Sequence, residues 1–245
     1  YHGTMENYFQ AKRRVFTMCK TAVINIDDEY GKRLVQEFSD IAVTYSAEGN
    51  ADYHAEFIRM NATGCSYMLV NEREKTACRV DMNMTGLYNV QNSLCAIAMV
   101  TALGFDMMEC AKALSDLDGV DGRMNVVYRG DFTVITDYAH TDDALIKVLS
   151  TLKPLTKGRL ICVFGAAGDR DKEKRPMMAK AAEDNADILV ITSDNPAHEN
   201  PDEIIREVMT GISGKKPCRC ITDRREAIAY ALDTARKDDV IILCG

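Results

Sequence analysis

The sequence has 245 residues, of which 47% are hydrophobic and 27% are charged, and its formal net charge is -7. This length predicts one or two globular domains with a buried core. The acidic surplus and the scattered basic residues argue against nucleic-acid binding, and no run approaches the roughly 20 apolar residues of a membrane span. The start lacks both a methionine and a signal-peptide pattern, so we expect an excerpt of a longer chain.

The nine cysteines are dispersed and odd in number, and no pair has the Cys-x-x-Cys spacing of a zinc site. Most lie in apolar runs, where they fit small buried side chains with reduced thiols in a cytoplasmic protein. One residue separates Cys218 from Cys220, and we expect them on alternate faces of a strand rather than in a metal site.

The first half of the chain mixes several kinds of element. Its pattern predicts a helix near 4–18, a strand at 22–25, a helix near 30–38 and a strand at 41–45. The alternating segments 54–61, 66–70 and 76–83 look antiparallel, and helices follow near 88–103 and 107–117. Gly104 fits the end of the first of these two helices. The loop 118–123 contains two glycines, and we place a boundary there between domains of residues 1–121 and 122–245.

The second half alternates between strands and helices. Residues 124–128 and 132–136 predict a hairpin, followed by a helix near 141–152. The apolar runs 159–165, 187–192 and 239–243 suit strands buried on both faces, with helices near 173–184, 201–211 and 223–236. Asn200 and Pro201 suit an N-cap and a first helical turn, and Thr222 or Asp223 could cap the last helix. The fold class is therefore α/β, with a parallel, Rossmann-like sheet in this half.

Polar loops follow two of the predicted parallel strands, at the edge where open α/β sheets bind ligands. Residues 165–171 form a glycine-containing turn without the Walker signature. Its Arg170 could hold a carboxylate through the planar guanidinium, although a solvated helix start fits equally well. In the second loop, Asp194 could pair with an ammonium and Asn195 could donate and accept hydrogen bonds. Taken alone, Asp-Asn-Pro favours a plain turn.

Other polar residues are ambiguous on spacing alone. His140 follows a predicted strand and could contact a phosphate, but a lone histidine is more often structural. Lys12 lies on an amphipathic helix, where a lysine is normally just solvated. Asn89 and Asn92 share one helix face, where local hydrogen bonding is the default. Three ligand-type loops on one sheet edge nevertheless favour a binding site.

Taken together, six patches in order along the chain resemble the Mur ligase family, and within it the MurE type. They are Tyr1 to Tyr8 with Lys12, Gly86-x-Tyr88-Asn89-x-x-Asn92, Gly119 to Met124, Asp137 to Thr141, Gly168 to Asp171 with Lys174-Arg175-Pro176, and Ser193 to Pro196. The Tyr-His-Gly start and the Gly-Asp-Arg-Asp run are MurE-like rather than typical of the sister ligases. The resemblance implies part of a central ATPase domain followed by a Rossmann-like C-terminal domain.

The resemblance also implies an ATP-dependent, cytoplasmic ligase of peptidoglycan synthesis. A carboxylate of UDP-N-acetylmuramoyl-L-alanyl-D-glutamate would take the γ-phosphate of ATP, and the amine of a free diamino acid would then displace phosphate. Lys12 would be carbamylated by CO₂, which turns an ammonium into the oxygen ligand that Mg²⁺ prefers. Asn89 and Asn92 would lie near the adenine, and Arg123 would face the phosphates.

The same resemblance assigns the remaining site residues. Asp137 and His140 would line the nucleotide side of the C-terminal domain, and His140 would be catalytic together with Lys12 and Arg123. The incoming amino acid would be held by Arg170, Asp194, Asn195 and Ala197. The enzyme is expected to be a monomer that binds neither nucleic acid nor membrane.

The residue after Asp-Asn-Pro predicts which amino acid is added. Family members that add meso-diaminopimelate usually carry arginine there for the distal carboxylate, whereas Ala197 resembles lysine-adding enzymes. We therefore predict L-lysine, with meso-diaminopimelate as the alternative. The family's Walker loop, its uridine-nucleotide domain and its Lys-Gly-His-Glu region are not in this sequence, so we expect the fragment alone to be inactive.

Two other interpretations compete with this one. Folylpolyglutamate synthase and the other Mur ligases share the architecture, but the pairing of Asp137 to His140 with Gly168 to Pro176 argues against both. A non-catalytic, Mur-like binding module is the other possibility, and a degraded phosphate loop upstream would distinguish it.

Overall fold

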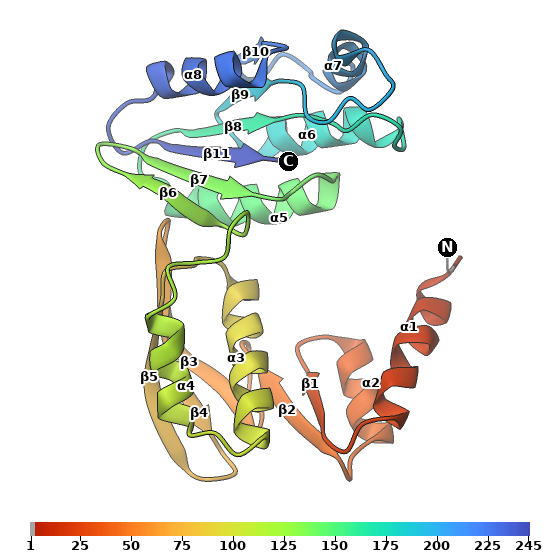
Figure 1. Ribbon diagram of the computed structural model, residues 1–245, viewed down its shortest axis with the longest axis vertical. Helices are drawn as coiled ribbons and strands as arrows, with labels where there is room; N and C mark the ends of the chain where they lie inside the picture. Colours follow the sequence, from red (N-terminus) through yellow and green to blue (C-terminus); the bar gives the residue numbers. More distant parts are fainter. Residues whose placement is uncertain (1–2) are drawn as a thin grey trace. The chain divides into compact units, whose positions relative to one another are not determined.

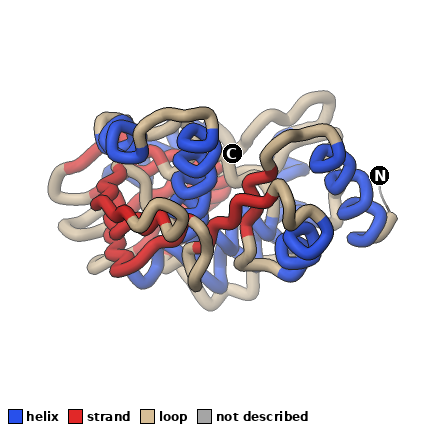
Figure 2. The backbone as a smooth tube through the Cα atoms, turned by 90° about the horizontal axis from the view of Figure 1, so that it is seen from below, coloured by secondary structure: helices blue, strands red, loops and turns tan. Residues whose placement is uncertain are grey.

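The computed structural model describes residues 3–245 and divides into two compact units. Unit 1 runs up to Met60 and from Gly64 to Asp118, and unit 2 comprises Asn61–Thr63 and Gly119–Gly245. Each unit has its own sheet (Figure 1), and the helices and strands are distinguished in Figure 2. The first two residues of the Tyr-His-Gly motif lie outside the described residues. No helix in residues 3–245 is long and apolar enough to cross a bilayer.

Unit 1 is built on a five-stranded sheet in the order β1-β2-β3-β4-β5. The strands are Ala22–Asn25 (β1), Ala42–Ser46 (β2), Tyr53–Asn61 (β3), Gly64–Asn71 (β4) and Thr76–Met82 (β5). The helices are Met5–Arg13 (α1), Glu29–Glu37 (α2), Leu87–Ala102 (α3) and Met107–Ser115 (α4), with a short 3₁₀ turn at Arg14–Thr17. The antiparallel prediction is confirmed for β4 and β5, whereas β3 runs parallel to β2.

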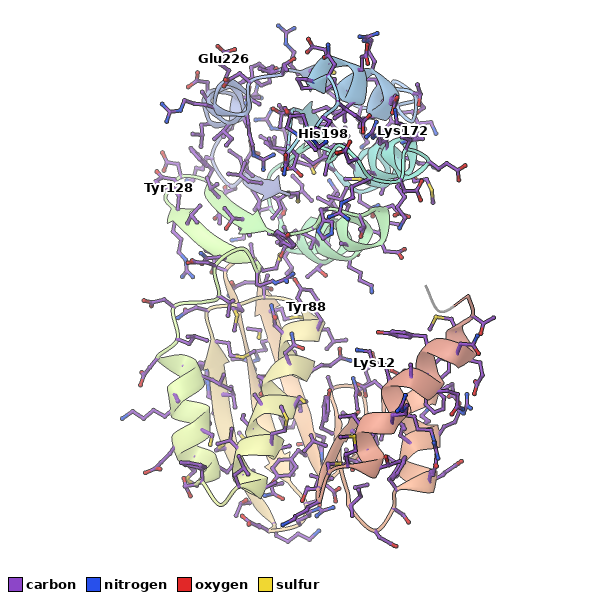
Figure 3. The ribbon with its side chains drawn as sticks, turned by 45° about the vertical axis from the view of Figure 1, so that its right-hand side comes forward. Lys12, Tyr88, Tyr128, Lys172, His198 and Glu226 are labelled. Carbon is purple, nitrogen blue, oxygen red and sulfur yellow. The ribbon has the colours of Figure 1, made fainter. Side chains whose placement is uncertain are left out.

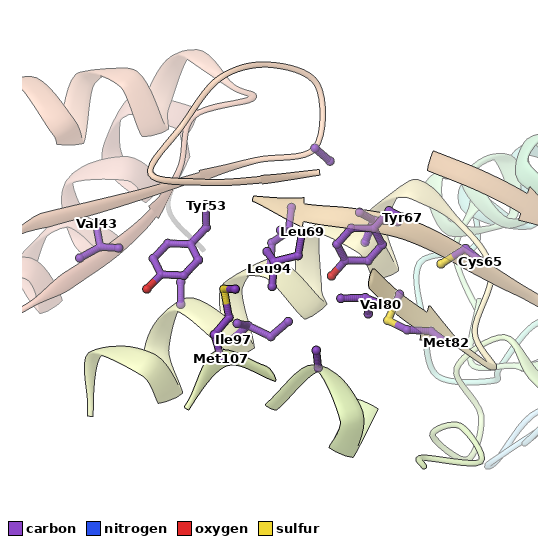
Figure 4. Close-up of a cluster of buried hydrophobic side chains, with 14 residues drawn as sticks. Val43, Tyr53, Cys65, Tyr67, Leu69, Val80, Met82, Leu94, Ile97 and Met107 are labelled. Carbon is purple, nitrogen blue, oxygen red and sulfur yellow. The ribbon is translucent and has the colours of Figure 1, made fainter. Parts of the chain in front are cut away.

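The core of unit 1 lies between its sheet and α3 and α4. Leu69 and Val80 come from neighbouring strands, and Leu94 and Ile97 come from α3 (Figure 4). All four side chains are at most 1% exposed. This burial supplies the hydrophobic free energy that holds α3 on the sheet. It also fixes the start of α3, where Asn89 and Asn92 lie.

Unit 2 contains a six-stranded sheet in the order β10-β9-β8-β11-β7-β6. Its strands are Asn125–Arg129 (β6), Thr133–Asp137 (β7), Leu160–Phe164 (β8), Ile188–Ile191 (β9), Cys218–Cys220 (β10) and Val240–Cys244 (β11). All pairs are parallel except β6 with β7, which form the predicted hairpin. The helices are Asp142–Leu152 (α5), Lys174–Asn185 (α6), Pro201–Met209 (α7) and Arg224–Thr234 (α8), with a 3₁₀ turn at Lys153–Leu155.

Local sequence signals set the helix starts in unit 2. The side chain of Thr141 accepts a hydrogen bond from the Ala144 amide at the start of α5. Asn200 caps α7 with Pro201 in its first turn, and Asp223 caps α8. These contacts confirm the predicted Asn200, Pro201 and Asp223 positions, because each cap pairs an amide that the helix itself leaves unbonded.

The prediction for Cys218 and Cys220 is wrong. Both residues lie in β10, and side chains two apart in a strand point to the same face. Our expectation of alternate faces applied the wrong spacing, since only adjacent residues alternate.

The core of unit 1 can be tested by truncating Leu94, which is fully buried. In the full-length protein, Leu94→Ala should lower the free energy of unfolding by about 2–5 kcal/mol, because it leaves a cavity in the core. Urea denaturation measures this, with Leu103→Ala as the control. Leu103 is 78% exposed, so its truncation should change stability by no more than about 0.5 kcal/mol. Equal losses in the two variants would contradict the packing described.

Candidate active site

The parallel strands of unit 2 end at one edge of its sheet, which we call the carboxyl edge. It consists of the residues that follow β7, β8, β9 and β11. A cavity of about 420 Å³ opens there, and its lining includes Tyr138, His140, Arg170, Lys174, Asp194, Asn195 and Gly245. The structure therefore brings together three of the predicted amino-acid residues and one of the predicted nucleotide residues. Only the topology of the sheet makes residues from such distant segments neighbours.

The cavity is lined by charges of both signs. Arg170 is exposed and takes part in no ion pair within residues 3–245, so its guanidinium is free to receive an anion. The Lys174 ammonium lies 3.6 Å from a carboxylate oxygen of Asp142. Asp194 lies in the same lining, half-buried. A free amino acid carries one carboxylate and one ammonium, and this pattern of charges complements it.

Two loops of the carboxyl edge are joined by their backbones. The Gly168 amide donates to the Asn195 carbonyl at 2.8 Å, and a Cβ atom on Gly168 would lie 1.9 Å from the Pro196 carbonyl oxygen. His198 bonds Asp169 at 2.6 Å, and this contact raises the pKa of His198. Glycine is therefore required at 168, because any side chain would separate the loops.

A buried arginine on α6 also holds the same two loops in place. Arg175 is 1% exposed, and its guanidinium donates to Glu199 at 2.7 and 2.9 Å and to Glu207 at 2.5 Å. Glu199 also accepts from the Asp169 amide at 2.7 Å. We call Arg175, Glu199 and Glu207 the Arg175 network. Its arginine holds the pKa of Glu199 well below the usual range, so the pair stays ionised at all physiological pH values.

Ala197 lies at the turn of the second loop. Its φ is +48°, its side chain is exposed, and its amide donates to the Asn195 side-chain oxygen at 3.1 Å. The bond leaves the Asn195 amide nitrogen as that side chain's available donor. Ala197 itself contributes no charge and does not line the cavity.

The residues expected near the nucleotide form a second group at the carboxyl edge. The guanidinium of Arg123 lies 5.4 Å from the ring centre of Tyr138, and the His140 ring lies 4.9 Å from the same ring. Asp137 is 8% exposed, and its two oxygens accept from the amides of Met124 and Ala139, both at 2.9 Å. Burial raises its pKa. Asp137 therefore fixes the backbone on either side of the group.

The candidate residues of unit 1 are placed separately. Lys12 projects from α1 (Figure 3) at the side of a mainly apolar cavity of about 330 Å³, with its ammonium 5.6 Å from the ring centre of Tyr8. Asn89 is buried, donates to the Thr85 carbonyl at 2.8 Å and accepts from Asn92 at 3.4 Å. The Lys12 cavity includes neither asparagine.

The fit of Mg²⁺ to these residues depends on a change at Lys12. An ammonium cannot bind a cation, and residues 3–245 hold no cluster of three or more His, Cys, Asp and Glu side chains suited to a metal. The side chain of Lys12 is exposed and therefore accessible to CO₂, and a carbamate there would supply oxygen ligands of the kind that Mg²⁺ prefers.

Comparison with known proteins identifies the family. The Mur ligase middle-domain model matches residues 1–100, and the Mur ligase glutamate-ligase-domain model matches residues 122–245. The chain belongs to the Mur ligase family. This confirms the predicted fold class, a Mur ligase middle-domain portion followed by the C-terminal α/β domain.

Individual Mur ligases resemble the chain over its whole length. The UDP-N-acetylmuramoyl-L-alanyl-D-glutamate–2,6-diaminopimelate ligase 1 of Clostridium acetobutylicum is 42% identical over 100% of this chain and 51% of its own. The corresponding ligase of Aquifex aeolicus is 39% identical over 100% and 50%. A solved 2,6-diaminopimelate ligase is 36% identical, with a TM-score of 0.70, over 100% and 52%. The chain thus spans about half the length of these relatives.

A more distant Mur ligase shares the fold. The MurF ligase of Thermotoga maritima, solved in complex with ADP, has a TM-score of 0.71 at 19% identity and covers 100% of this chain and 55% of its own.

Sequence reasoning missed the place of Lys174 in the cavity lining and the contacts of the Arg175 network. Lys174 and Arg175 belong to the Lys-Arg-Pro motif of the family resemblance, but that resemblance assigned neither residue a role. Nothing in the sequence pattern singles out Glu199. One signal was available: an arginine inside a helical pattern, followed by acidic residues at 199 and 207, suggests a buried ion pair. The distances between these segments could come only from the structure.

The Arg175 network can be tested by removing its cation. Arg175→Met in the full-length Mur ligase removes the buried cation shared by Glu199 and Glu207 and leaves them only the exposed Lys172 as a common partner. Because both keep some exposure, we expect a loss of about 3 kcal/mol in unfolding free energy, the lower end for a broken buried pair. Urea denaturation measures the loss. Lys172→Met is the matched control, and Lys172 is labelled in Figure 3. It contacts the same two carboxylates, but its side chain is 61% exposed. Lys172→Met should destabilise the protein far less than Arg175→Met, because water screens an exposed ion pair. Equal losses in the two variants would refute the network's role.

Proposed function

We propose that the protein is a MurE-type ligase that joins a diamino acid to UDP-N-acetylmuramoyl-L-alanyl-D-glutamate in an ATP-dependent reaction. The cavity at the carboxyl edge carries this proposal, because it combines a free guanidinium with carboxylate and amide groups. Arg170 would bind the α-carboxylate of the incoming amino acid. Asp194 and Asn195 would bind its ammonium until a proton leaves and the amine becomes a nucleophile.

The chemistry requires an activated acyl group. The substrate carboxylate attacks the γ-phosphorus of ATP, the bond to the bridging oxygen breaks, and ADP leaves. The amine then attacks the acyl phosphate carbon, and phosphate leaves as the amide forms. Arg123 and His140 are proposed to offset the negative charge that gathers at the phosphates, with Asn89 and Asn92 near the adenine. ATP use is supported by the family and by the complex of the Thermotoga maritima MurF ligase with ADP.

The names of the relatives favour 2,6-diaminopimelate as the amino acid. They give no support to L-lysine, which Ala197 alone predicted, and we therefore propose diaminopimelate. Its second carboxylate needs a cation. Lys174 lines the cavity, and its only ion pair within residues 3–245, with Asp142, is long at 3.6 Å. We propose that Lys174 supplies the charge that Ala197 lacks.

This assignment is tested by comparing the two amino acids in a ligation assay of the full-length protein. We expect preference for meso-diaminopimelate. Lys174→Met should raise the KM for meso-diaminopimelate about tenfold, the effect of losing one charge-assisted hydrogen bond. The KM for L-lysine should barely change. Lys180→Met is the control, since Lys180 is 69% exposed and pairs with Asp184 on the outer face of α6. A clear preference for L-lysine would reject diaminopimelate and restore the interpretation based on Ala197. No ATP-dependent ligation at all would favour a non-catalytic binding module.

The carbamate at Lys12 is proposed to bind Mg²⁺. Lys12→Ala in the full-length protein should reduce kcat at least about 100-fold, because a metal ligand worth several kcal/mol of transition-state stabilisation is lost. Added acetate or formate should restore part of the activity, since a short carboxylate can take the place of the carbamate. The control is Lys32→Ala, an exposed lysine paired with Glu29 on α2. Full activity of Lys12→Ala without added carboxylate would eliminate the carbamate.

A further inference from the structure

We propose that Met209, Cys218 and Cys220 form a binding site for a monovalent soft metal ion, Cu(I). Met209 lies at the end of α7, and the two cysteines lie on β10, a strand at one edge of the unit 2 sheet (Figure 1). None of them lines the cavity at the carboxyl edge. The inference therefore does not depend on the proposed ligase function.

The spacing of the sulfurs suits a shared ion. Cys218 Sγ lies 3.8 Å from Met209 Sδ. Two sulfurs each about 2.3 Å from one ion lie about 4 Å apart when the angle at the metal is near trigonal. The first two ligands are therefore already at bonding separation, and a metal could enter with little movement of α7 or β10.

Cys220 completes the set. It is two residues after Cys218 in an extended strand, so both side chains lie on one face of the strand. Cys218 is half-buried, whereas Cys220 is exposed. The open side of the cluster gives an ion access.

The ligand types select the metal. Thioether and thiolate sulfurs favour Cu(I), whereas carboxylate and imidazole ligands would be expected for harder ions. Structural zinc sites have four ligands from Cys, His, Asp and Glu, and residues 3–245 hold no group of even three. Burial raises the pKa of Cys218 to about 12, so Cu(I) must displace its proton. The Glu183 carboxylate, whose charge acts on Cys218, favours a cation, and the Arg219 charge acts on Cys220 in the direction that favours its thiolate.

The test measures Cu(I) withdrawal from a coloured chelator such as bathocuproine disulfonate by anaerobic, reduced full-length protein. We expect the wild type to bind one Cu(I) ion strongly. Cys218→Ser and Cys220→Ser should each lower the affinity for Cu(I) at least about tenfold. Met209→Leu keeps the packing volume but not the sulfur, and it should weaken binding by a smaller factor. X-ray absorption of the loaded protein should show sulfur neighbours only.

Matched controls separate this site from general thiol reactivity. Cys19→Ser removes a half-buried cysteine elsewhere and should leave affinity unchanged, as should Met108→Leu, which changes an exposed methionine on α4. Circular dichroism confirms folding, and Cys218→Ala provides a second variant if the serine variant unfolds. Equal Cu(I) uptake by the wild type and the Cys218→Ser/Cys220→Ser variant, or equal losses in Cys19→Ser, would overturn the proposal.

Discussion

The cavity at the carboxyl edge of unit 2 depends on one buried cation. Arg175 is enclosed by the protein, and its guanidinium must be neutralised because an unpaired charge in such a place is costly. Glu199 and Glu207 provide the two carboxylates, and Glu199 also takes the Asp169 amide. Any separation of the two loops would break these bonds together. The loops are therefore held in position before a ligand arrives.

The basic residues of the segment 170–175 differ in whether their charge is already paired within the protein. Arg175 is fully engaged in ion pairs with Glu199 and Glu207. Arg170, by contrast, is exposed, has no ion pair within residues 3–245 and lines the cavity. Lys174 is intermediate, because its charge is only weakly paired through a long contact with Asp142. Rigid loops that carry free charges need little reorganisation on binding, which improves both affinity and the orientation of a nucleophile.

Much of the fold follows from local sequence. The apolar runs of β8, β9 and β11 are buried on both faces, as continuous hydrophobic runs predict. Asn200, Pro201 and Asp223 define helix starts because they satisfy amides locally. The hairpin of β6 and β7 was equally clear, since its turn signal lies between two apolar segments.

The site was only partly predictable. Arg170, Asp194 and Asn195 follow strands, so topology places them at one edge, and family resemblance gave their roles. Asp137 lies at the expected edge, but both of its oxygens are bonded to backbone amides, a contact that spacing cannot reveal. Ala197 alone cannot decide which amino acid is added, because one missing charge says nothing of cations elsewhere in the cavity. Glu199 reaches Arg175 only through the folded chain.

The central claim is that the carboxyl edge is a preformed pocket for the incoming amino acid. A crystal structure of the full-length protein with the bound diamino acid tests it most directly. The account predicts the α-carboxylate on Arg170, the ammonium between Asp194 and Asn195, and the Arg175 network unchanged from the free state. An amino acid bound away from these residues, or one that draws Arg175 out of its contacts with Glu199, would contradict it.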